Sequence, residues 1–146
     1  MSSSEGAFVP PRAGLVLVVD DDASIRLVAT RILQYGGYRV GSASSVSEAL
    51  DVCHGELPDL VLCDFNMPGA DGSVLLRELR ARHGVDAPPF AFVTAHHGDA
   101  RLATLDGVAA IIPKPFTMEQ ILGLVAKFVI PRPGSIAAMR LTVPTK

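Results

Sequence analysis

Acidic residues gather at the ends of two short apolar segments of the chain. Leu15–Val19 runs directly into Asp20–Asp22, and Leu60–Cys63 runs into Asp64. Continuous apolar runs of this length are typical of parallel strands buried on both faces, and ligands of such sheets bind beyond the carboxyl ends of the strands. If the two strands are neighbours, each pair of carboxylates at ~5 Å and an effective dielectric of ~20 costs roughly 3 kcal/mol. Such a cluster calls for a cation, a proton or a chemical use.

Two further polar residues follow other apolar segments. Thr94 ends the segment that begins at Phe90, and Lys114 comes shortly after Val108–Ile112. Carboxylate oxygens are hard ligands of the kind that Mg²⁺ prefers, often together with water and a phosphate. A hydroxyl and an ammonium group suit phosphoryl oxygens, and a carboxylate beside Mg²⁺ is able to attack phosphorus and form an aspartyl phosphate.

The elements that must position these residues alternate between strand and helix. The predicted strands cover 15–20, 38–42, 59–64, 90–94 and 108–112. Each strand is followed by a segment with helical spacing of apolar residues or with a capping signal. The predicted helices are 25–33, 45–54, 73–82, 99–106 and 117–128, and the one at 99–106 is short and weakly patterned. Strict alternation implies a parallel sheet with helices on both faces.

Bulk properties exclude several classes of function. The chain has 146 residues, 49% of them hydrophobic, and a net charge of −2, which fits one globular domain without a basic field for nucleic acid or an acidic membrane surface. Its apolar runs are shorter than the ~20 residues of a membrane helix, and we expect a cytoplasmic protein. Cys53 and Cys63 form no metal-ligand spacing and no disulfide framework.

The two ends of the chain differ from the middle in composition. Residues 1–14 are rich in Ser, Gly and Pro, and 131–146 carry basic residues and three prolines but no acid. We expect a flexible leader at 1–14, one domain at 15–130 and a flexible tail at 131–146 that is too short for an output domain. The alternative for the tail is a short binding segment at Ser135–Val143.

Four motifs stand in order on the predicted strands and loops. They are Val18-Val19-Asp20-Asp21, Asp64-x-x-Met67-Pro68-x-x-Asp71-Gly72, Thr94-Ala95 and Lys114-Pro115-Phe116. Over about residues 15–129 the chain resembles the response-regulator receiver domain of two-component signalling, in particular the single-domain, chemotaxis-regulator-like type. The resemblance implies a flavodoxin-like (βα)5 doubly wound parallel sheet in the strand order 2-1-3-4-5.

The resemblance also implies a role for each matching residue. Asp64 would be the phosphoacceptor, and Asp20, Asp21, Asp64 and the backbone carbonyl of Asn66 would hold Mg²⁺. Thr94 and Lys114 would bind the phosphoryl group, with a cis peptide bond between Lys114 and Pro115. In one respect the chain departs from the family, because Ile111 stands where an aromatic residue is usual, so the usual aromatic switch is not assumed.

The implied function is that of a signalling switch. It would accept a phosphoryl group from a phosphohistidine of a sensor histidine kinase or a histidine phosphotransfer protein, and would catalyse only its own phosphorylation and dephosphorylation. It would then signal by binding a downstream target protein. We expect no nucleic-acid or membrane partner, and a monomer or weak homodimer.

Other readings of the same residues remain open. Asp20-x-Asp22 resembles the paired aspartates of a haloacid-dehalogenase-like phosphatase, in which Asp20 would be the nucleophile and Asp22 the general acid. Such enzymes usually carry a cap domain and further acidic residues late in the chain, for which the sequence offers no candidates. A flavin-binding flavodoxin relative is the third reading, although the acidic residues after the first strand would repel a flavin phosphate. His96, two residues after Thr94, is a candidate modulator of dephosphorylation, and the adjacent His96 and His97 do not have the geometry of a metal pair.

Overall fold

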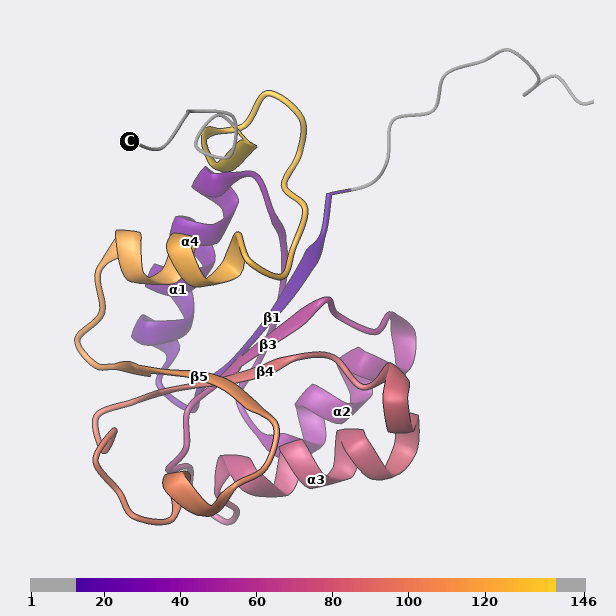
Figure 1. The fold of residues 1–146 in the computed structure, drawn as a ribbon, viewed down its shortest axis with the longest axis vertical. Coiled ribbons are helices and arrows are strands. Elements are labelled where there is room, and N and C mark those ends of the chain that lie inside the picture. The colour runs from indigo at the N-terminus through magenta and orange to yellow at the C-terminus, as the bar shows by residue number, and fades with distance from the viewer. Residues whose placement is uncertain (1–12, 139–146) are drawn as a thin grey trace, which may run out of the picture.

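A five-stranded parallel sheet forms the centre of the molecule (Figure 1). The computed structural model describes residues 13–138. The strands are β1 (Leu15–Val19), β2 (Arg39–Ala43), β3 (Leu60–Cys63), β4 (Phe90–Thr94) and β5 (Val108–Pro113). Their order, β2-β1-β3-β4-β5, confirms the predicted flavodoxin-like topology and places the crossover between β1 and β3.

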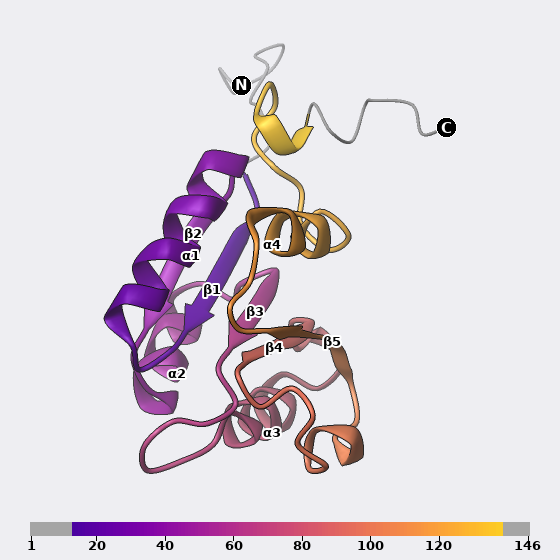
Figure 2. The same ribbon diagram turned by 90° about the vertical axis from the view of Figure 1, so that its left-hand side faces the viewer.

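Helices cover both faces of the sheet (Figures 1 and 2). The helices α1 (Ala23–Gly36) and α4 (Met118–Val125) pack on one face, and α2 (Val46–Gly55) and α3 (Gly72–His83) on the other. Successive side chains of β1 alternate between the two apolar clusters, since Val16 and Val18 join the first and Leu17 and Val19 the second. A strand buried on both faces needs this continuous apolar run.

Capping residues set the helix boundaries close to the predicted ones. The side chain of Asp22 accepts hydrogen bonds from the backbone at the start of α1, and Ser45 does the same for α2. Thr117 and Gln120 form the predicted capping box of α4. Gly37 ends α1 with φ of 102°, a left-handed conformation that glycine adopts without steric cost.

The connection between β4 and β5 differs from the prediction. The helix expected over Asp99–Asp106 is absent, and the segment holds only a short 3₁₀ turn, Leu102–Thr104. A similar turn, Gly84–Asp86, follows α3. Leu102 is the one buried residue of the 3₁₀ turn after β4, too little apolar surface to anchor a longer helix on the sheet. On β5, Ile111 is 37% exposed.

The segment after α4 folds back onto the amino ends of the strands. The N–H of Arg132 donates to the carbonyl of Gly37 at 2.9 Å, and Ser135 and Ala137 are buried. The described part of the predicted tail, 131–138, thus lies against the end of α1, where small side chains pack. The N–H of Gly14 likewise donates to the carbonyl of Ile130 at 2.8 Å. The rest of the predicted leader and tail, 1–12 and 139–146, lies outside the described residues.

Within residues 13–138, every helix is too short or too polar to cross a membrane.

Candidate functional site

Three carboxylates meet at the carboxyl ends of β1 and β3. The two strands pair in parallel with Val19 opposite Cys63, so Asp20 and Asp64 leave the sheet side by side. Asp20, Asp21 and Asp64 each offer an oxygen, and these oxygens lie within 4.8 Å of one another. The carboxylates of Asp20 and Asp64 are buried and that of Asp21 is exposed. The predicted convergence of these three residues is thus what the structure shows.

Lys114 lies between the two buried carboxylates. Its Nζ donates to Asp20 Oδ2 at 2.6 Å and is 3.4 Å from Asp64 Oδ2. The residue is held at the end of β5, where its backbone N–H donates to the carbonyl of Thr94 at 3.0 Å. The peptide bond between Lys114 and Pro115 is cis, as predicted. One ammonium group therefore offsets part of the charge of two acids.

The environment of the site shifts the pKa values of Asp64 and Lys114. Burial raises the pKa of Asp64, and the nearby charge of Asp20 raises it further, although Lys114 opposes both effects. Burial alone would lower the pKa of Lys114, but its hydrogen bond to Asp20 and the charges of Asp64 and Asp20 outweigh burial and raise it. Asp64 is thus a carboxylate short of positive charge, beside a lysine that stays protonated at neutral pH.

Asp20 is fixed by its own neighbourhood. Its Oδ1 accepts the N–H of Asp22 at 2.9 Å, and its backbone carbonyl accepts Nη1 of Arg26 at 2.6 Å. The side chain of Asp22 is turned away to cap α1, accepting from Ser24 N at 2.8 Å. Asp22 therefore belongs to the helix rather than to the acidic cluster. No sequence motif indicated this contact of Arg26, which was recognisable only as a residue near the start of the first predicted helix.

Thr94 closes the site on the β4 side. The residue is completely buried, and its Oγ1 accepts the backbone N–H of His96 at 3.1 Å. A hydroxyl that accepts one bond keeps its hydrogen for a second partner. His96 and His97 are exposed, and neither joins a group of potential metal ligands among residues 13–138.

The loop after β3 brings the backbone of α3 against Asp64. The N–H of Gly72 donates to the carbonyl of Phe65 at 2.7 Å, and a Cβ at this position would lie 2.5 Å from the carbonyl oxygen of Asp64. Only glycine permits this approach. Asp71 caps α3 by accepting from Ser73 N at 2.9 Å. Asn66 is exposed at the start of this loop, two residues after Asp64.

Sequence reasoning missed Arg101, which reaches this loop from the β4–β5 connection. Its guanidinium lies over the ring of Phe65, with Cζ 4.8 Å from the ring centroid. Arg101 lies in an irregular loop, so no regular spacing in the sequence links it to the acidic motifs.

The chemistry of this donor set fits a hard divalent cation. Three carboxylate oxygens at this mutual distance are the ligands that Mg²⁺ takes, with water and a phosphoryl oxygen completing its coordination. Burial, and to a lesser extent the charge of Asp20, raises the pKa of Asp64, and a cation at this position would favour its charged form.

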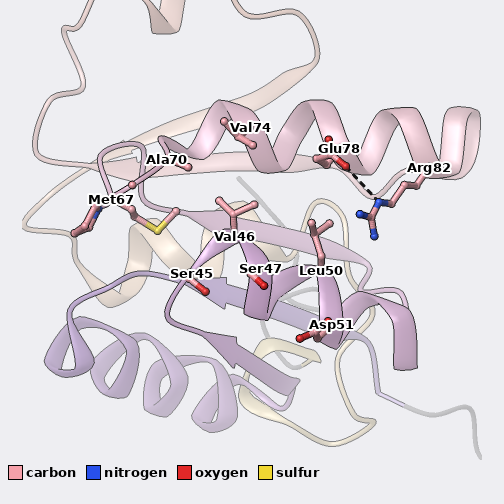
Figure 3. Close-up of a pocket in the computed structure, with 12 residues that line it drawn as sticks. Ser45, Val46, Ser47, Leu50, Asp51, Met67, Ala70, Val74, Glu78 and Arg82 are labelled. Atoms are coloured by element: carbon pink, nitrogen blue, oxygen red, sulfur yellow. Dashed lines mark ion pairs between the residues drawn. The ribbon is translucent and has the colours of Figure 1, made fainter.

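A separate groove lies between α2 and α3 (Figure 3). This groove of about 500 Å³ is lined by Val46 and Leu50 of α2, by Met67 of the loop after β3 and by Val74 of α3. It contains none of the three clustered acids, so its size does not make it the candidate site.

A family model described as the response regulator receiver domain matches residues 16–126. The chain belongs to this family. Among curated relatives of this receiver domain, the DNA-binding transcriptional regulator NtrC of Escherichia coli is 36% identical over 116 residues, which are 78% of this chain and 24% of NtrC. The response regulator MprA of Mycolicibacterium vanbaalenii is 39% identical over 108 residues, 73% of this chain and 46% of MprA. The chain thus spans less than half the length of either relative.

Solved receiver structures share the fold. The chemotaxis protein CheY4 of Vibrio cholerae superposes with a TM-score of 0.74 at 27% identity, over 80% of this chain and 99% of that one. The response regulator TrrA of Thermotoga maritima, solved in complex with Mg²⁺ and BeF, gives 0.70 at 28% identity, over 78% of this chain and 97% of that one. A structural neighbour of this receiver domain has therefore been solved with magnesium.

Proposed function

We propose that this receiver domain accepts a phosphoryl group on Asp64 in a Mg²⁺-dependent reaction. The observation that carries the proposal is the buried Asp64 beside Asp20, Asp21 and Lys114, in a chain of the receiver family. The donor would be a phosphohistidine of a sensor histidine kinase or of a histidine phosphotransfer protein. Bound Mg²⁺ would neutralise charge on the phosphoryl oxygens and the acids.

In the proposed transfer, three side chains of this chain have roles. An oxygen of Asp64 forms the new bond to phosphorus, the bond from phosphorus to the histidine nitrogen breaks, and that nitrogen keeps the electron pair. Lys114, 3.4 Å from Asp64, pairs with a phosphoryl oxygen, and the hydroxyl hydrogen of Thr94 donates to another. Hydrolysis returns inorganic phosphate and the free carboxylate, so the domain catalyses only its own phosphorylation and dephosphorylation.

Phosphorylation would act as a signal through partner binding. The phosphoryl group adds about −1.5 to −2 charges at a site that already holds three acids, which biases the loops around it. We assign the domain to the cytoplasm, as a monomer or weak homodimer that acts on a downstream protein. NtrC is named as a DNA-binding regulator, but our proposal for the residues of this chain includes no nucleic-acid contact.

Beryllofluoride, which mimics a phosphoryl group on a carboxylate, tests the proposal. The chain has no tryptophan, so binding is best followed by amide NMR shifts during titration with beryllofluoride and Mg²⁺. We expect Mg²⁺-dependent binding by the native protein and none by Asp64→Asn. Unchanged binding by Asp64→Asn, with loss in Asp20→Asn, would instead indicate the phosphatase reading.

A further inference from the structure

The β4–β5 connection, 95–107, is tied to the loop after β3 by one side chain. Arg101 is 59% exposed, yet its guanidinium contacts several groups at once. Its Nη2 donates to Asn66 Oδ1 at 3.5 Å, and its Nη1 is 3.9 Å from Asp71 Oδ2. The ring of Phe65 lies beneath it, 4.8 Å from Cζ. All three partners belong to the segment that directly follows Asp64.

The backbone of Arg101 is fixed on its own side. Asp99 Oδ1 accepts its N–H at 2.9 Å, Asp99 Oδ2 accepts Nη2 at 2.8 Å, and its carbonyl accepts the hydroxyl of Thr104 at 2.8 Å. The hydrogen bonds from Arg101 hold the pKa of Asp99 at about 2, so this anchor stays charged at any physiological pH. The next residue, Leu102, is buried in the same apolar cluster as Phe65.

The other end of the connection touches the site through Thr94. The N–H of His96 donates to Thr94 Oγ1, so the first residues after β4 depend on the position of that hydroxyl. The segment 95–107 therefore meets the site at two places, through Thr94 at its start and through Arg101 in its middle.

We propose that Arg101 is a positioning residue that couples the β4–β5 connection to the loop carrying Asn66. This inference rests on the proposed function, because Asn66 is two residues from the proposed phosphoacceptor and its carbonyl is a proposed metal ligand. Coupling is reciprocal. A ligand that fixes the loop 65–71 therefore also orders the β4–β5 connection, 95–107. That connection is then the segment whose order changes on phosphorylation.

A guanidinium is needed for this set of contacts. It is planar, stacks on an aromatic ring and donates in several directions at once, whereas an ammonium group on a flexible stem does not. Arg101→Lys keeps the charge and is expected to restore only part of the coupling. Arg82 provides the matched control, since it is an exposed arginine paired with Glu78 at 3.4 Å on α3.

Amide hydrogen exchange of the full chain, with and without beryllofluoride and Mg²⁺, tests the coupling. The reporters are the amides of Leu102, Ala103 and Thr104, which donate to carbonyls within the same connection. In the native protein we expect the ligand to slow their exchange by about fivefold. Arg101→Ala should bind the ligand and lose this protection, Arg101→Lys should keep part of it, and Arg82→Ala should match the native protein.

Each outcome decides the inference. The inference is overturned if beryllofluoride protects the amides of 102–104 in Arg101→Ala as strongly as in the native protein. It is also overturned if the substitution speeds their exchange by the same factor with and without the ligand, because a purely structural contact would give that result. If the native protein does not bind beryllofluoride, the proposed function fails by itself. The ligand-free comparison then decides the coupling: faster exchange of the Gly72 amide in Arg101→Ala supports it, and unchanged exchange overturns it.

Discussion

Lys114 is the residue on which the balance of charge at the site depends. It is mostly buried, and it is the cation that pairs with both Asp20 and Asp64. A buried carboxylate that loses its partner is costly, since the charge is then neither hydrated nor compensated. The same pairing that stabilises the domain without ligands places an ammonium group where phosphoryl oxygens would arrive.

Replacing this lysine should therefore destabilise the fold as well as the site. We expect Lys114→Ala to lower the free energy of unfolding by about 3 kcal/mol at neutral pH, measured by urea denaturation. The raised pKa of Lys114 means that the contribution of its ion pairs is present below its ordinary value of 10.5 and is lost as pH rises through the folded value.

The control for this prediction is an ion pair that is exposed to solvent rather than buried. Arg82→Ala removes an exposed pair on α3 and should change the free energy of unfolding by less than about 0.5 kcal/mol. If both variants lost the same free energy of unfolding, burial of the Lys114 ion pairs would not be the reason for the loss.

The charged form of Asp64 lowers the stability of the folded domain. Because its pKa is raised in the folded protein, its contribution to stability is fully present below its ordinary value of 3.8 and is lost as pH rises through the folded value. At neutral pH, without a cation, Asp64→Asn should raise the free energy of unfolding by about 1 kcal/mol. Thermal melts across pH check this, since the gain should shrink on acidification. A gain that grows at low pH would contradict the assignment.

At the scale of elements, the backbone around the site is as specific as the side chains. The start of α3 approaches β3 so closely that Gly72 has no room for a Cβ beside Asp64 and Phe92. Such contacts come from tertiary packing and are invisible in the motif Asp71-Gly72, which the sequence explains equally well as an ordinary turn.

Two glycine substitutions separate this packing from helix propensity. Gly72→Ala should cost about 2 kcal/mol and disturb the position of Asp64, because the added carbon meets backbone. Gly123→Ala, in α4 with open space around it, should stabilise by about 0.5–1 kcal/mol. Thermal unfolding of both variants provides the comparison, and a stabilised Gly72→Ala would refute the close approach.

The elements with strong periodic signals could be predicted from sequence, and those without could not. Buried strands such as Leu60–Cys63 and capped helices such as the one opened by Thr117 lie close to their predicted positions. The failure lies between β4 and β5, where a weak pattern around Leu102 suggested a helix that tertiary packing does not support. Arg101 could not be assigned to the site for the same reason, since an irregular loop brings it there.

At the scale of the whole molecule, the acidic site and the packed segment 131–138 lie at opposite ends of the sheet. The N–H of Arg132 donates to the carbonyl of Gly37, shortly before β2 begins, whereas Asp20 and Asp64 follow the carboxyl ends of β1 and β3. Figure 1 shows the strands running between these two ends. Composition alone indicated a loose tail, because prolines and small residues dominate there. Those small residues instead fit against Gly37, where a Cβ would lie 2.3 Å from that of Ser135.

We propose that Asp64, and not Asp20, carries the phosphoryl group. The most direct measurement is mass spectrometry of the protein after treatment with acetyl phosphate and Mg²⁺, with borohydride reduction to mark the modified aspartate. We predict one added phosphoryl group, located on Asp64, dependent on Mg²⁺ and absent from Asp64→Asn. Modification of Asp20 with Asp64 untouched, or undiminished modification of Asp64→Asn, would show that Asp64 is not the phosphoacceptor.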